Sequence, residues 1–103
     1  MRRPAKVKNI MKLTSTAVKT GQLLYSGHAN ERLHERRIIK PEVEVVLTSG
    51  HHEARKDQFN QQHGVWDYAI RGKTADGRSL RIVVALIEPK VLIVTAIDLD
   101  KEE

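Results

Sequence analysis

The sequence contains no cysteine, and this absence excludes three kinds of site at once. Disulfide scaffolds, thiolate zinc sites and cysteine nucleophiles all need that residue. Long apolar runs are missing as well. None approaches the roughly 18 residues that a membrane span needs, and the first residues lack the apolar region of a secretory signal. We therefore expect a cytoplasmic protein without membrane association.

Motifs of several enzyme classes are also absent. The sequence has no glycine-rich phosphate loop, no Gly-x-Ser-x-Gly elbow and no paired carboxylates of the glycosidase type. His51, His52 and His63 raise the question of a metal site, but neither a His-x-x-x-His pair nor a recognisable carboxylate spacing accompanies them. The sequence therefore indicates no metal and no other cofactor.

Positive charge, in contrast, is in excess. The chain has 18 Lys and Arg residues against 13 Asp and Glu residues, which gives a net charge of +5 and a pI near 9.7. A basic domain with clustered arginines is typical of proteins that contact nucleic acid, although part of the excess lies in the N-terminal segment. We therefore expect contact with RNA or DNA.

Helical spacing dominates the first half of the chain, whose total length suits a single domain. Residues 1–23 form a basic segment, which predicts either an amphipathic helix beginning just after Pro4 or a frayed arm. A second helix is predicted over 26–37. A short third helix is predicted over 41–50, where alternating valines also fit a strand.

The second half of the chain has the spacing of strands and turns. Strands are predicted over 51–58, 66–73, 80–87 and 91–99, with a hairpin turn at Asp76-Gly77. The expected fold is a single α+β domain over 24–99, in which two or three N-terminal helices pack on a four-stranded antiparallel meander sheet. An acidic tail over 100–103 ends the chain.

The start of the second predicted helix carries side chains suited to phosphate chemistry. His28 and Arg32 lie one helical turn apart, close enough to meet the same anion, and the exposed amides of a helix start attract negative charge. An imidazole moves protons near neutral pH, and a guanidinium binds a phosphate with two hydrogen bonds. The alternative is a solvated His28 beside an Arg32 that pairs with Glu35 or Glu31.

Arg81 begins a predicted central strand that is otherwise apolar, so it needs a partner, an open edge or an anionic ligand. Asp98 or a carboxylate from a helix is the candidate partner. A two-residue hairpin loop would place Gly72 opposite Arg81, whereas a three-residue loop would place Arg71 there. Thr95 puts a hydroxyl into the last apolar strand. The remaining candidates for nucleic-acid contact are Arg36, Lys56, Arg71 and Lys73.

A longer pattern resembles a known family. It comprises His28-Ala29-x-x-Arg32-x-x-Glu35-Arg36-x-Ile38, then Pro41-Glu42-Val43-x-x-Val46-Leu47, and finally Leu92-Ile93-Val94-Thr95. The pattern is similar to that of small bacterial domains of unknown function whose members begin with a His-Ala-x-x-Arg-x-x-Glu-Arg helix. The resemblance covers about residues 24–99.

That family is distantly similar to the RelE-like ribonuclease toxins. The resemblance implies N-terminal helices on an antiparallel sheet, RNA cleavage without a metal and an antitoxin protein as partner. His28 and Arg32 match the helix motif, and Arg81 and Thr95 correspond to polar strand residues of the toxins. The chain departs from the better-studied toxins because acidic residues, instead of a catalytic tyrosine or histidine, follow its last strand.

The leading hypothesis is therefore a metal-independent endoribonuclease of the toxin type. His28 would take the proton from a ribose 2′-hydroxyl, while Arg32 and Arg81 stabilise the charge that develops on phosphorus. The general acid is not identified, and this mechanism requires all three side chains to meet around one anion. The alternatives are a non-catalytic nucleic-acid-binding module and a protein-interaction domain.

Overall fold

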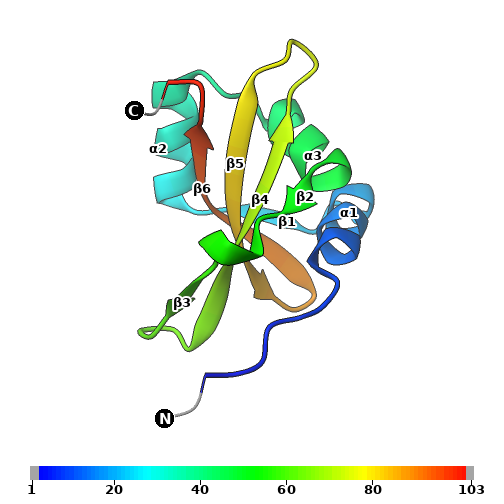
Figure 1. Cartoon of the computed structure of the whole chain (residues 1–103), viewed down its shortest axis with the longest axis vertical. Coiled ribbons are helices and arrows are strands. Elements are labelled where there is room, and N and C mark those ends of the chain that lie inside the picture. The colour runs from blue at the N-terminus through cyan, green and yellow to red at the C-terminus, as the bar shows by residue number, and fades with distance from the viewer. Residues whose placement is uncertain (1–2, 102–103) are drawn as a thin grey trace.

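The computed structural model describes residues 3–101, and a six-stranded sheet lies at its centre (Figure 1). The elements in chain order are α1 (Ile10–Thr20), β1 (Leu23–Tyr25), α2 (Gly27–Arg36), α3 (Lys40–Ser49), β2 (His51–His52), the 3-10 turn η1 (Ala54–Lys56), β3 (Gln58–Asn60), β4 (Val65–Lys73), β5 (Ser79–Ile87) and β6 (Lys90–Asp98). The strand order is β1-β6-β5-β4-β2, and β3 also pairs with β4. Residues 102–103 of the predicted tail and 1–2 of the predicted basic segment lie outside the described range.

The predicted four-stranded antiparallel meander is wrong, although the α+β class is confirmed. Strands β4, β5 and β6 are antiparallel as expected. Strand β1, however, pairs with β6 in parallel, and the predicted strand over 51–58 is two short strands separated by η1. Strands β1, β2 and β3 have only two or three residues each, so no alternating pattern marks them in the sequence.

Helix α1 packs its apolar side against α3. Ile10, Thr14 and Ala17 are buried at the spacing of one helix face. The Thr14 hydroxyl donates a hydrogen bond to the Leu47 carbonyl at 2.8 Å. The helix begins later than predicted because residues 3–9 run across the end of β4, where backbone groups of this segment bond the side chains of Trp66 and Tyr68.

The other two helices begin as predicted. The Ser26 hydroxyl accepts a hydrogen bond from the backbone N–H of Ala29 and so caps α2. Helix α3 has Pro41 in its first turn, and the Glu42 carboxylate accepts from the backbone N–H of Ile39. The strand alternative for 41–50 is therefore wrong, and the buried face of α3 packs on the sheet.

The two faces of the sheet differ in what covers them. Large apolar side chains such as Ile70, Ile82 and Ile93 are fully buried on the face under α1 and α3. The opposite face, called the open face below, carries the intervening residues of β4, β5 and β6, including Asp67, Arg81 and Leu92. Helix α2 lies beside this face along β6, and η1 crosses in front of it (Figure 1).

A buried carboxylate fixes η1 in that position. The Asp57 side chain is fully buried, and its Oδ1 accepts from the backbone N–H of Ala69 at 2.9 Å. Its Oδ2 lies 2.7 Å from His52 Nε2 and 3.0 Å from Lys6 Nζ. Strand β4, the 3-10 turn and the N-terminal segment are thus joined at one point. In residues 3–101, every helix is too short or too polar to cross a membrane.

Candidate functional site

Two neighbouring hollows are present on the open face. The first, called the histidine hollow, has a volume of about 580 Å³; Ser26, His28, Asn60, His63 and Asp67 supply its polar groups. The second, called the arginine hollow, has a volume of about 380 Å³ and includes Lys56, Gln58, Arg81 and Thr95. Asp67 and Val94 line both hollows. The two hollows therefore adjoin each other at Asp67 and Val94.

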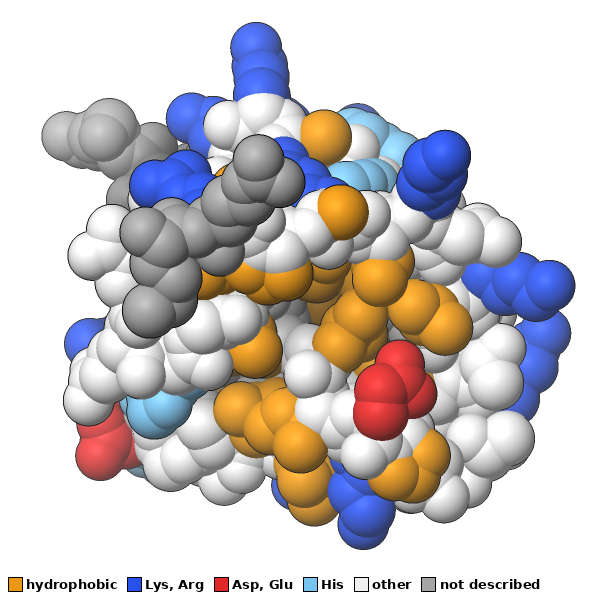
Figure 2. Space-filling model, turned by 90° about the horizontal axis from the view of Figure 1, so that it is seen from below, with side chains coloured by type: hydrophobic (Ala, Val, Ile, Leu, Met, Phe, Trp, Pro, Cys, Tyr) orange, Lys and Arg blue, Asp and Glu red, His pale blue; other side chains and the backbone are white. Residues whose placement is uncertain are grey.

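The floor of the histidine hollow is apolar. Ala85 pairs directly with Asp67 on one side and with Leu92 on the other, so these three residues form a row across β4, β5 and β6. The partner of β5 changes from Thr95 to Ile93 between Val83 and Val84, which leaves Val94 as an extra residue in β6. Apolar side chains gather at the end of the molecule that Figure 2 shows, with Lys and Arg side chains mainly around its edge.

His28 lies where the sequence predicted it. It is exposed in the first turn of α2, just after the Ser26 cap, and its side chain lines the histidine hollow. Arg32 does not join it there. Its guanidinium lies 2.7 Å from the Glu35 carboxylate on the same helix, as the alternative interpretation of the sequence predicted, and neither hollow includes Arg32.

Arg81 has the carboxylate partner that its position in the strand required, but the partner is Glu53. The guanidinium donates to Glu53 Oε1 at 2.7 Å and to Oε2 at 3.3 Å. This hydrogen bonding lowers the pKa of Glu53 against the opposing effect of burial, and the positive charges of Arg81, Arg71 and His51 lower it further. Asp98, the partner proposed from the sequence, instead accepts from Arg78.

The remaining predicted residues lie in different places. Thr95 and Lys56 line the arginine hollow beside Arg81. Arg71 pairs with Arg81 across β4 and β5, the register of the three-residue loop, but lines a separate shallow hollow at β2. Arg36 donates to the carbonyl of Ala96, and Lys73 is exposed at the end of β4.

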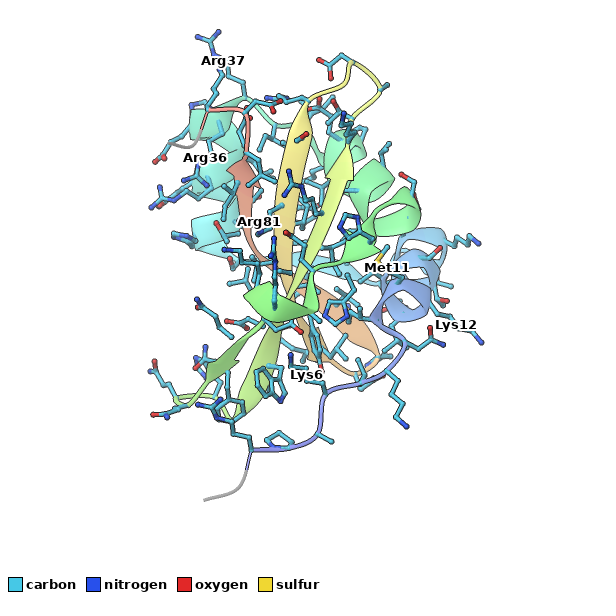
Figure 3. All side chains as sticks on the ribbon, viewed as in Figure 1. Lys6, Met11, Lys12, Arg36, Arg37 and Arg81 are labelled. Carbon is cyan, nitrogen blue, oxygen red and sulfur yellow. The ribbon has the colours of Figure 1, made fainter. Side chains whose placement is uncertain are left out.

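The predicted meeting of His28, Arg32 and Arg81 around one anion is therefore not observed. Arg32 and Arg81 are each paired with a carboxylate of the protein. Of the three side chains, only His28 and Arg81 line the hollows, and they line different, adjoining ones. Figure 3 shows Arg81 in front of β5 and next to η1, with Arg36 away from it on the α2 side.

Three polar residues of the histidine hollow were missed by the sequence analysis as site residues. His63 lies in the turn between β3 and β4, and its backbone N–H donates to Asn60 Oδ1 at 3.1 Å. Asp67 makes no side-chain hydrogen bond or ion pair with another residue of 3–101. Partial burial raises the pKa of the Asp67 carboxyl, and the nearby His63 partly offsets this effect. The alternation of side chains along β4 was the signal that could have located Asp67, since it places Asp67 on the face of the sheet opposite to that of Trp66 and Tyr68.

The histidine hollow thus contains side chains of types that can exchange protons. Two imidazoles and a carboxyl of raised pKa line the same space, and cationic Lys56 and Arg81 lie next to it. No group of three or more His, Asp or Glu side chains within 3–101 has an arrangement that could hold a metal ion. The chemistry that this arrangement supports is acid–base catalysis beside an anion.

Comparison with other proteins identifies the family. No curated protein matches the sequence. A protein-family model described as "Domain of unknown function (DUF4258)" matches residues 25–98. The match extends from the last residue of β1 to the last residue of β6, and it includes every residue that lines the two hollows. It agrees with the resemblance seen in the sequence over about 24–99, and the chain therefore belongs to the DUF4258 family of domains of unknown function.

Proposed function

We propose that this protein is a metal-independent endoribonuclease that binds single-stranded RNA on its open face. One observation carries the proposal: His28 and His63 line the same hollow, and Lys56 and Arg81 line the hollow next to it. Two imidazoles can supply the base and the acid of phosphodiester cleavage, and the neighbouring cations can bind the phosphate. The resemblance to RelE-like toxins supports the same activity and adds an antitoxin protein as the expected partner.

The proposed reaction is a transfer within the RNA chain. His28 accepts the proton of a ribose 2′-hydroxyl, whose oxygen attacks the adjacent phosphorus and forms a 2′,3′-cyclic phosphate. His63 donates a proton to the departing 5′-oxygen, so one imidazole gains a proton and the other loses one. Lys56 offsets the charge that develops on the phosphate. Arg32 has no part in this scheme because its guanidinium is held by Glu35.

The test is cleavage of a single-stranded RNA oligonucleotide in the presence of a chelator. We expect products that end in a 2′,3′-cyclic phosphate, and we expect His28→Ala and His63→Ala each to reduce the cleavage rate about 100-fold or more. His34→Ala is the matched control, since His34 is exposed on α2 and lines neither hollow. Full activity of either hollow variant would remove that histidine from the mechanism, and dependence on a divalent metal would overturn the proposal.

A second candidate is RNA binding without cleavage. It is favoured by the two ion pairs that occupy Arg32 and Arg81, because these guanidiniums were the groups expected to stabilise the transition state. In that case the protein would retain RNA in a salt-dependent manner, and the bound RNA would remain intact. The cleavage assay separates the two candidates when it is run beside a binding assay on the same oligonucleotide.

A further inference from the structure

We propose that the histidine hollow holds one unpaired guanine base, with Asp67 and Asn60 binding its hydrogen-bonding edge and the apolar floor contacting its ring. This inference deepens the proposed function, since it names the nucleotide that the same pair of hollows recognises. It uses residues that have no part in the proposed proton transfers. It can therefore fail or succeed independently of cleavage.

The central observation is a carboxylate without a partner. Asp67 is partly buried on the open face, at the point where the two hollows meet, and no side chain or backbone group of 3–101 hydrogen-bonds its oxygens. The other acidic side chains near the open face differ in this respect: Glu53 binds Arg81, and Asp57 binds His52 and Lys6. These oxygens stay accessible from the hollow and are not sealed in the interior, so a ligand with N–H groups can reach them, and hydrogen bonds to a charged acceptor are stronger than those between neutral groups.

A donor is available beside this acceptor. Asn60 pairs with Val65 across β3 and β4, and Gln58 pairs with Asp67, so Asn60 is the diagonal neighbour of Asp67. The Oδ1 atom of Asn60 accepts from the backbone N–H of His63. This contact fixes the orientation of the amide and leaves its NH₂ group to donate to a ligand in the hollow.

The floor of the hollow suits a flat ring. Ala85 and Leu92 continue the row that begins at Asp67, and the extra residue Val94 lies next to them in β6. All three line the histidine hollow. A planar base on this apolar row has one edge towards Asp67, and the hollow, at about 580 Å³, is within the size range of small-molecule sites.

Guanine fits the polar groups better than the other three bases do. Its N1–H and N2–H₂ groups are adjacent donors, which match the two oxygens of a carboxylate, and its O6 accepts from the Asn60 amide. Uracil offers one donor between two carbonyls. Adenine and cytosine place a ring nitrogen lone pair next to their amino group, and that lone pair repels a carboxylate. Base pairing occupies the same edge of guanine, so the base must be unpaired.

The test uses 2′-O-methyl hexanucleotides, which lack the 2′-hydroxyl that cleavage requires. A fluorescently labelled hexauridylate analogue is compared with versions carrying one central guanosine, adenosine, cytidine or inosine, and binding is measured by anisotropy. We expect the guanosine version to bind about tenfold more tightly than the adenosine, cytidine and all-uridine versions, because one bidentate contact discriminates against the wrong base by about this factor. Inosine lacks the N2 amino group, so its affinity should lie between these two levels.

Asp67→Asn should reduce the guanosine preference to about twofold or less, because an amide presents only one acceptor. Glu44→Gln, on α3 across the sheet, removes the same charge and should leave the preference intact. The inosine comparison keeps the test decisive even if Asp67→Asn folds poorly, since it alters the ligand and leaves the protein unchanged. Equal affinity for the guanosine and inosine versions, or a guanosine preference that persists in folded Asp67→Asn, would overturn the proposal.

The two proposals fail in different ways. Cleavage of RNA by a protein without guanosine preference overturns the guanine subsite and leaves the ribonuclease proposal standing. Guanosine preference without cleavage of ordinary RNA supports the subsite and overturns the ribonuclease. Absence of binding to all five oligonucleotides at low salt overturns both.

Discussion

At the scale of single residues, Glu53 determines which charges the open face presents. Its carboxylate holds Arg81 through two hydrogen bonds and lies 3.7 Å from Arg71. Glu53 is only 7% exposed, so its negative charge is compensated mainly by these arginines. The pair therefore both stabilises the fold and reduces the positive charge available to a ligand.

We predict that Glu53→Gln destabilises the protein by about 3 kcal/mol at pH 7, because it leaves Arg81 without its compensating charge. The hydrogen bond from Arg81 lowers the pKa of Glu53 from its ordinary value of 4.5. A carboxyl with a lowered folded-state pKa stabilises the fold above its unfolded-state pKa, and this contribution is lost as pH falls through the folded-state value. Urea denaturation at several pH values should therefore show the difference between the two proteins narrowing below pH 4.5.

The matched control is Glu35→Gln, which removes the carboxylate partner of Arg32 on the surface of α2. The Glu35 side chain is 56% exposed, and such surface pairs contribute little to stability. We expect the free energy of unfolding to change by no more than about 0.5 kcal/mol. A loss in Glu35→Gln as large as that in Glu53→Gln would show that burial does not distinguish the two pairs.

The sequence predicted some residues of the site but not its most distinctive one. His28 could be located because Ser26 marks a helix start, and such a local signal does not depend on the tertiary structure. The carboxylates that hold Arg32 and Arg81 could be anticipated as a class, but the choice of Glu53 over Asp98 depends on the position of η1. Asp67 resembles any strand carboxylate in sequence, and only the absence of a partner distinguishes it.

At the scale of elements, α3 approaches β4 unusually closely at two glycines. A Cβ atom at Gly50 would lie 2.5 Å from the Arg71 carbonyl oxygen and 2.6 Å from that of Val46. A Cβ at Gly72 would lie 3.2 Å from the Gly50 Cα. The C-terminal end of the helix and the strand therefore pack backbone to backbone, and this contact sets the position of β4 beneath the open face.

We predict that Gly50→Ala destabilises the protein by about 2–3 kcal/mol, because the methyl group can be accommodated only if α3 or β4 shifts. Thermal or urea denaturation measures the loss. Gly27→Ala is the control, since a Cβ there meets no atom within 4 Å, and its effect should be within about 0.5 kcal/mol. A Gly50→Ala protein as stable as Gly27→Ala would show that the two elements separate without cost.

The sequence predicted that the third helix ends at Gly50, and the structure confirms this. Gly50 has φ −80°, so it does not use the left-handed conformation that favours glycine at helix ends. Long elements such as β5 and β6 carry enough alternation to be predicted. Strand β1 could not be predicted, because its place depends on parallel pairing with β6, nearly 70 residues later in the chain.

At the scale of the whole molecule, the net charge of +5 is compatible with the RNA ligand that we propose, but it does not say which surface would bind that ligand. Ion pairs within the protein compensate part of the positive charge, since Arg32, Arg78 and Arg81 each pair with a carboxylate. Under the proposed function, the positive charge that the open face presents to RNA depends on the cations that lack such a partner. Lys56 is one of these within 3–101, being exposed at the arginine hollow without a side-chain hydrogen bond or ion pair.

Because Lys56 lies on the open face and other lysines lie elsewhere, substitutions can distinguish a local phosphate contact from attraction by the net charge of the whole protein. We predict that Lys56→Gln weakens binding of a single-stranded oligonucleotide several-fold and reduces the slope of log K against log salt by about 0.7, as expected for one lost phosphate contact. Lys19→Gln makes the same change in net charge on α1, behind the sheet, and should leave the slope nearly unchanged. Binding measured from 50 to 200 mM salt tests both variants. If the two substitutions weaken binding equally, the attraction comes from net charge alone, and the open face is not the RNA-binding surface.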